Sequence, residues 1–139
     1  MRGLSLKEAN TIIEGAFEKA DELKLKPLCV VVLDAGGHVK AVQKQDGASL
    51  LRFDIAHGKA FASLGMGRSS KLVLQKYRDK PIFMENLFDM SYHPLFLEGG
   101  GQLIPDEFGE VVGAVGINGD VNETDDECAF AGIKKPDFM

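Results

Sequence analysis

Two β-hairpins constrain the fold of this chain more than any other feature of its sequence. Residues 28–33 form an apolar, valine-rich run, and the tetrapeptide DAGG separates them from a second strand-like run at 38–45. A second pair of runs, residues 102–105 and 110–118, flanks a turn at 106–109. Strands joined by such short turns pair antiparallel, because parallel strands need a crossover of about a dozen residues or more. The sequence therefore predicts an antiparallel sheet, with the run at 28–33 in its interior.

Helical patterns surround the hairpins. Residues 5–25 repeat apolar side chains at three- and four-residue intervals, and Ser5 and Glu8 have the spacing of a capping box. Two further helices are expected over residues 49–64 and from Ser69 or Ser70 to about Tyr77. Residues 81–96 are expected to form a short helix followed by a loop. A last helix is expected to begin at a cap at Asn122 or Thr124 and to end at about Lys134. The order α-β-β-α-α-β-β-α predicts an α+β fold in which helices flank the sheet.

Size and charge exclude several classes of protein. The chain has 139 residues and a net charge of −5, which fits one domain over residues 1–139 and argues against a basic nucleic-acid-binding surface. No apolar run approaches the roughly 20 residues that span a bilayer, and no apolar segment follows Met1. We expect a soluble, cytoplasmic protein that binds neither nucleic acid nor membrane. Cys29 and Cys128 lack metal-type spacing and are expected to be buried thiols.

Histidines are the most informative titratable residues, because common phosphate-loop, hydrolase and metalloprotease motifs are missing from the sequence. His57 lies on the apolar stripe of the second helix, and His93 lies in a loop rich in Met and Phe. Each is a candidate iron ligand or general acid/base, with a satisfied core or surface histidine as the alternative. His38 begins a strand beside a turn and is expected to be exposed.

A run of three glycines, Gly99, Gly100 and Gly101, is the strongest backbone signal. Three consecutive glycines carry a large entropic cost unless positive φ or a close approach requires them. Exposed amides there would bind a carboxylate, and Arg52 and Lys59 on the second helix would add positive charge. The alternative for both cations is a solvated position on the surface. The glycines of the GAVG segment at 113–116 are expected to let a helix pack closely over the strand.

Several segments in the same order resemble one known family. The matching segments are VVLDAGGH at 31–38, QDGA at 45–48, DIAxxKA at 54–60 (x being any residue), GGQLIP at 100–105, GEVVGAVGI at 109–117 and DDECA at 125–129. Together they resemble the GlcG/HbpS-like haem-binding family, which includes the C-terminal domain of PduO-type proteins. The resemblance runs from about Leu4 to Lys135.

The resemblance implies a profilin-like α-β-α sandwich with a central antiparallel sheet, and homo-oligomers that bind haem or a related tetrapyrrole. It also implies that Ser69 or Ser70 stands in for the hydroxyl of a turn that precedes the third helix in relatives. The leading functional hypothesis is a cytoplasmic, oligomeric haem-binding protein in which His57 or His93 supplies the axial nitrogen. The alternatives are a cofactor-independent enzyme, such as an isomerase of a small carboxylated or carbonyl metabolite, and a purely structural assembly subunit.

Overall fold

A four-stranded antiparallel sheet forms the centre of the protein. The computed structural model describes residues 3–119 and 121–135, and its strands are β1 (Cys29–Asp34), β2 (Val39–Lys44), β3 (Gly101–Pro105) and β4 (Val111–Asn118). Their order across the sheet is β2-β1-β4-β3, and every neighbouring pair is antiparallel. Both predicted hairpins are confirmed, and β1 lies inside the sheet as its apolar composition indicated.

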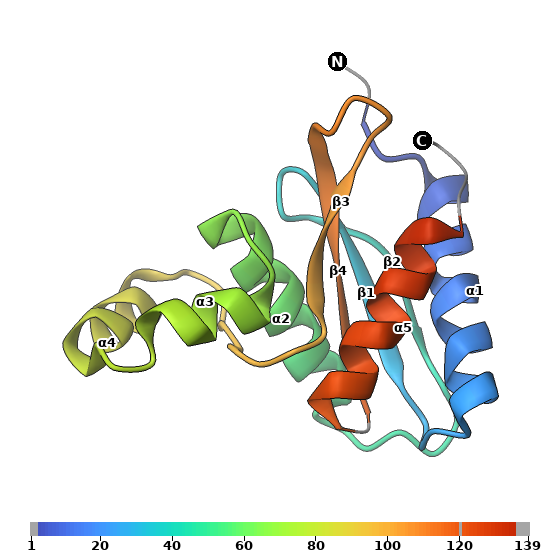
Figure 1. The fold of residues 1–139 in the computed structure, drawn as a ribbon, viewed down its shortest axis with the longest axis horizontal. Helices are drawn as coiled ribbons and strands as arrows, with labels where there is room; N and C mark the ends of the chain where they lie inside the picture. Colours follow the sequence, from blue (N-terminus) through green and yellow to red (C-terminus); the bar gives the residue numbers. More distant parts are fainter. Residues whose placement is uncertain (1–2, 120, 136–139) are drawn as a thin grey trace.

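Helices cover both faces of the sheet (Figure 1). Helices α1 (Leu6–Leu23) and α5 (Asn122–Lys134) lie on one face, and α2 (Arg52–Met66) lies on the other. Alternate residues of β1 serve the two layers: Val30 and Val32 pack in the cluster with α1 and α5, whereas Val31 and Leu33 pack in the cluster with α2. This double burial explains why β1 is apolar throughout, and it gives the predicted α-β-α sandwich.

Local sequence signals set most of the helix ends. Ser5 caps α1, and its reciprocal bonds with Glu8 form the predicted capping box. The predicted cap of α5 is wrong: Val121 occupies the N-cap position without a side-chain bond. Asn122 instead accepts a bond from Lys59, and the hydroxyl of Thr124 donates to the carbonyl of Val121 at 2.9 Å.

The segment after α2 leaves the body of the molecule. Helix α2 ends at Gly67, which adopts the left-handed conformation, and α3 (Ser70–Tyr77) and α4 (Pro81–Met90) then extend away from the sheet (Figure 1). No residue of α4 is buried, and Ile82 and Met90 are each more than 70% exposed. Across the described ranges, we find no helix with the length and apolar character needed to cross a membrane.

Helix α2 packs unusually close to β4. A Cβ atom on Gly116 would overlap the carbonyl oxygen of Ala56, so only glycine permits this approach. The predicted role of the GAVG segment is therefore confirmed at Gly116. Ala56 and Ala60 form the face of α2 nearest to Gly116, and the buried Phe61 packs with them against the sheet.

Candidate functional site

The two candidate histidines meet on the surface beside α2. Helix α2 presents Phe53, His57 and Phe61 at four-residue intervals, and the loop after α4 brings Tyr92 and His93 against them. The ring centroids of His57 and His93 lie 5.3 Å apart in an edge-to-face contact, and those of Phe61 and His93 lie 5.0 Å apart. The fold thus joins two residues that the sequence places on different elements.

Burial favours the neutral imidazole of His57. Partial burial lowers the pKa of His57 below its ordinary value of 6.5, and the neighbouring His93 lowers it further, while Asp54 acts in the opposite direction. Near pH 7 the ring is therefore uncharged. An uncharged imidazole has the free nitrogen lone pair that a metal ligand or a general base requires.

A small cavity of about 260 Å³ opens beside the two imidazoles. Its lining combines His57 and His93 with Val39, Phe53, Asp54 and Pro94, so most of its wall is apolar. His38 lines a different cavity together with Leu4 and Val112, and its side chain is 83% exposed, as predicted. The alternation of β2 fits this separation, because Val39 lines the cavity beside His57 whereas the next residue, Lys40, lines the cavity of His38.

The two cations expected beside a ligand carboxylate make bonds within the chain. Arg52 is half-buried and donates from Nη1 to Asn118 Oδ1 at 2.8 Å. Lys59 is fully buried, so the alternative of a solvated surface lysine is wrong. Its Nζ lies 2.9 Å from the oxygen of Ile117, 3.3 Å from Asn122 Oδ1 and 3.2 Å from Asp125 Oδ2.

Lys59 therefore ties α2 to β4 and α5. Burial lowers the pKa of Lys59 below 10.5, and the carboxylate of Asp125 offsets part of this effect. Since the Lys59 side chain has no exposed surface, its ammonium group does not contact a ligand on the surface.

The glycine run and the two serines also form hydrogen bonds with other residues of this chain. The amide of Gly100 donates to Asp126 Oδ1 at 2.8 Å, and that of Gly101 donates to Ser70 Oγ at 2.9 Å. Ser70 Oγ donates to the carbonyl of Glu98, and Ser69 Oγ caps α3. The expectation that Gly100 and Gly101 expose their amides to a ligand is therefore wrong, because a carboxylate and a hydroxyl of this chain occupy them.

Close approach explains the glycines. Gly100 has φ of 125°, and a Cβ atom on Gly101 would overlap the carbonyl oxygen of Lys59. A Cβ atom on Gly99 would come within 2.8 Å of the carbonyl oxygen of Asn122. The neighbouring backbone that requires these glycines belongs to the same chain.

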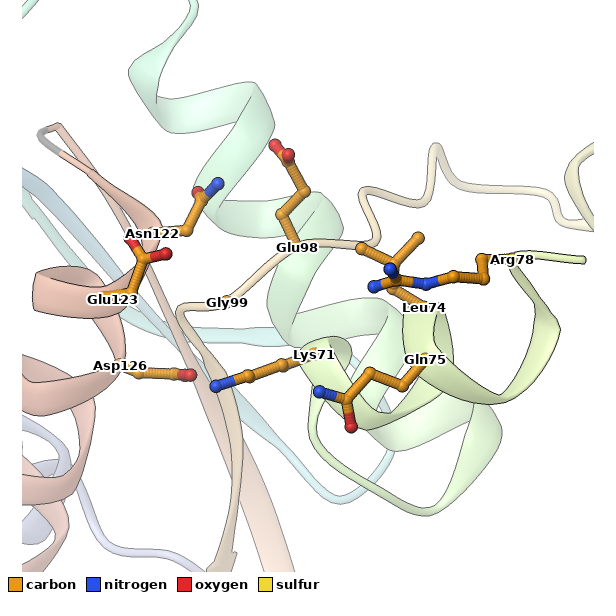
Figure 2. Close-up of a pocket in the computed structure, with 9 residues that line it drawn as sticks. All are labelled: Lys71, Leu74, Gln75, Arg78, Glu98, Gly99, Asn122, Glu123 and Asp126. Carbon is orange, nitrogen blue, oxygen red and sulfur yellow. The ribbon is translucent and has the colours of Figure 1, made fainter.

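A second cavity, of about 210 Å³, was not predicted from the sequence. It lies between α3, the Glu98–Gly99 segment and the first turn of α5 (Figure 2). Its charged lining residues are separated along the chain and carry no shared motif, so only the fold reveals that they meet. Within residues 3–119 and 121–135, no group of three His, Cys, Asp or Glu side chains could hold a metal ion.

The fold and the paired histidines define an α-β-α sandwich protein with a surface imidazole site. The chain belongs to the HbpS-like family, described as haem degrading protein HbpS-like, whose family model matches residues 4–134. No curated protein sequence matched the chain.

Solved structures share the fold at low sequence identity. Klebsiella pneumoniae protein ORFY superposes with a TM-score of 0.85 at 22% identity, covering 96% of this chain and 90% of that chain. PduOC, solved as a haem complex, gives 0.84 at 22% identity, with coverage of 99% and 98%. A double mutant of Streptomyces reticuli HbpS gives 0.83 at 23% identity, with coverage of 96% and 87%. These likenesses confirm the predicted fold class.

Proposed function

We propose that this protein binds haem, or a related tetrapyrrole, beside α2, with His57 or His93 as the axial ligand of the metal. The observation that carries the proposal is the contact between the two imidazoles at the edge of an apolar cavity. Imidazole is a common axial ligand of haem iron, and the neutral state of His57 suits it to bind a metal. Family membership and the haem complex of PduOC support the same ligand.

The geometry favours one histidine as the ligand and the other as its neighbour. Because the two rings already contact each other, a flat macrocycle does not fit between them without moving one ring. Phe53, Val39 and Pro94 offer apolar surface to the macrocycle. Of the two cations expected to pair with a propionate, only Arg52 has exposed atoms.

The functional form that we propose is a homo-oligomer in the cytoplasm. The cavity of about 260 Å³ is smaller than the roughly 300–1,000 Å³ typical of pockets that enclose drug-sized ligands, so it would cover only part of a tetrapyrrole. Leu50, Leu51 and Tyr92 are at least 60% exposed, and a second copy would shield such side chains from water. Cys29 is a free, buried thiol, in agreement with a reducing compartment.

Titration of the purified protein with haemin tests the proposal. We expect a saturable shift of the Soret band, which His57→Ala or His93→Ala changes in position or weakens by about tenfold or more in affinity. His38→Ala is the matched control, because His38 lines a different cavity, and it should behave as the parent protein. The absence of a Soret shift, or equal spectra and affinities for all three variants, would refute the proposal.

The enzymatic alternative is less well supported. An isomerase would use His57 or His93 as acid/base and the glycine amides as the oxyanion site. The amides of Gly100 and Gly101 already donate to Asp126 and Ser70, so this oxyanion site is lost.

A further inference from the structure

The cavity between α3 and α5 has walls of opposite charge (Figure 2). Lys71, on α3, and Arg78, at its C-cap, line one side, while Glu123 and Asp126, in the first turns of α5, line the other. Glu98 lies between the two helices at the edge of the cavity. None of these residues lines the cavity beside His57 and His93.

Most of these charges are not neutralised within the chain. In the part of the chain that the structure describes, the side chains of Lys71, Arg78, Glu98 and Glu123 form neither a hydrogen bond nor an ion pair. Two cations and two carboxylates therefore line one small space, and of these Glu98 also acts on the buried Lys59, whose pKa it raises.

Hydrogen bonds hold the floor of the cavity, formed by Asp126 and Asn122, in place. Asp126 Oδ1 accepts from the amide of Gly100 at 2.8 Å and from Gln102 Nε2 at 3.1 Å. Asn122, which also lines the cavity, accepts from the buried Lys59. A rigid floor lowers the entropic cost of binding, because fewer groups have to be ordered when a ligand enters.

We propose that this cavity binds a small zwitterion, a free amino acid with an aliphatic side chain. Its carboxylate would pair with Lys71 and Arg78, and its ammonium group with Glu98 and Glu123. A simple anion would face the carboxylates without compensation, and a simple cation would face the two basic side chains. A volume of about 210 Å³ suits a small metabolite, and Leu74 gives the wall one apolar patch.

Three molecules of similar shape separate the charge requirements. L-Valine carries both charges, 3-methylbutanoate lacks the ammonium group, and 2-methylpropylamine lacks the carboxylate. Calorimetric titration of the full chain up to about 10 mM ligand, with glycine and L-serine as smaller zwitterions, measures affinities down to the millimolar range. We expect L-valine to bind, and its two single-charge analogues to bind about tenfold more weakly than valine or not at all.

Variants connect the affinity to the cavity. Arg78→Gln and Glu123→Gln should each weaken the zwitterion about tenfold, since each removes one charged partner from an exposed position. Lys76→Gln is the matched control on α3, because Lys76 does not line the cavity, and His57→Ala should likewise leave this binding unchanged. Failure of L-valine to bind overturns the proposal. Equal binding of valine and its single-charge analogues, or no effect of Arg78→Gln and Glu123→Gln, also overturns it.

Discussion

The buried ion pair between Lys59 and Asp125 offers the sharpest test of how this fold is held together. Both side chains are fully buried, and Lys59 Nζ lies 3.2 Å from Asp125 Oδ2. The change Lys59→Met keeps most of the side-chain volume but leaves the Asp125 carboxylate in the interior without its cation. Asp125→Asn leaves the ammonium group with two neutral oxygen acceptors, those of Ile117 and Asn122.

Either single change should be strongly destabilising. Removing one member of a buried ion pair typically costs about 3–5 kcal/mol, because the remaining buried charge loses its counter-charge. For a chain of this size, such a loss corresponds to a decrease in Tm of roughly 10–20 °C. In the double variant Lys59→Met/Asp125→Asn neither position carries a buried charge, so its loss of stability should fall about 1–3 kcal/mol short of the sum of the single losses.

Urea unfolding followed by circular dichroism measures these free energies. Lys135→Met is the matched control, because Lys135 pairs with Glu18 at a shorter distance, 2.7 Å, but on the surface. Water screens that pair, so its loss should barely move the unfolding midpoint. The reasoning is refuted if Lys59→Met and Asp125→Asn are no more destabilising than Lys135→Met, or if the double variant loses the full sum.

Three further predictions concern single positions. Because the pKa of His57 is lowered in the folded protein, the unfolded chain binds a proton at His57 more readily than the folded chain as the pH falls below about 7. The free energy of unfolding, measured by urea titration, should therefore decrease toward about pH 5. This decrease should be smaller in His57→Gln. In thermal melts, Gly116→Ala should prevent stable folding or lower the Tm strongly, since its Cβ would overlap the Ala56 carbonyl. Gly65→Ala, where the Cβ would enter open space beside a helix, should instead stabilise the protein by about 0.5–1 kcal/mol. Ser5→Ala removes a cap and should cost about 1 kcal/mol in urea unfolding; an unchanged midpoint would contradict the role of the capping box.

The hairpins and most helices could be predicted because their signals are local. An Asp-Ala-Gly-Gly turn between two strand-like runs and a capping box at Ser5 act within a few residues, and both formed as expected. The cap of α5 failed for a non-local reason. Asn122 has the side chain of a good cap, but Lys59 competes for its oxygen from another helix.

The interior role of Lys59 could not be predicted for a similar reason. Lysine on a helix is usually solvated, and nothing near Lys59 in the sequence shows that Ile117, Asn122 and Asp125 will surround its ammonium group. The glycine run was correctly singled out, but its partner was not. An external carboxylate was expected, whereas Asp126 from α5 supplies the acceptor.

Helix α2 connects the two proposed sites through opposite faces. Residues 57 and 59 are separated by about 200° around a helix, so His57 faces the cavity while Lys59 points into the interior. Lys59 binds Asp125, and the next residue, Asp126, holds the floor of the cavity between α3 and α5. A change at Lys59 should therefore weaken haemin and zwitterion binding together, whereas a change at His57 should affect haemin alone. Loss of haemin binding with intact zwitterion binding in Lys59→Met would show that the buried pair does not support both sites.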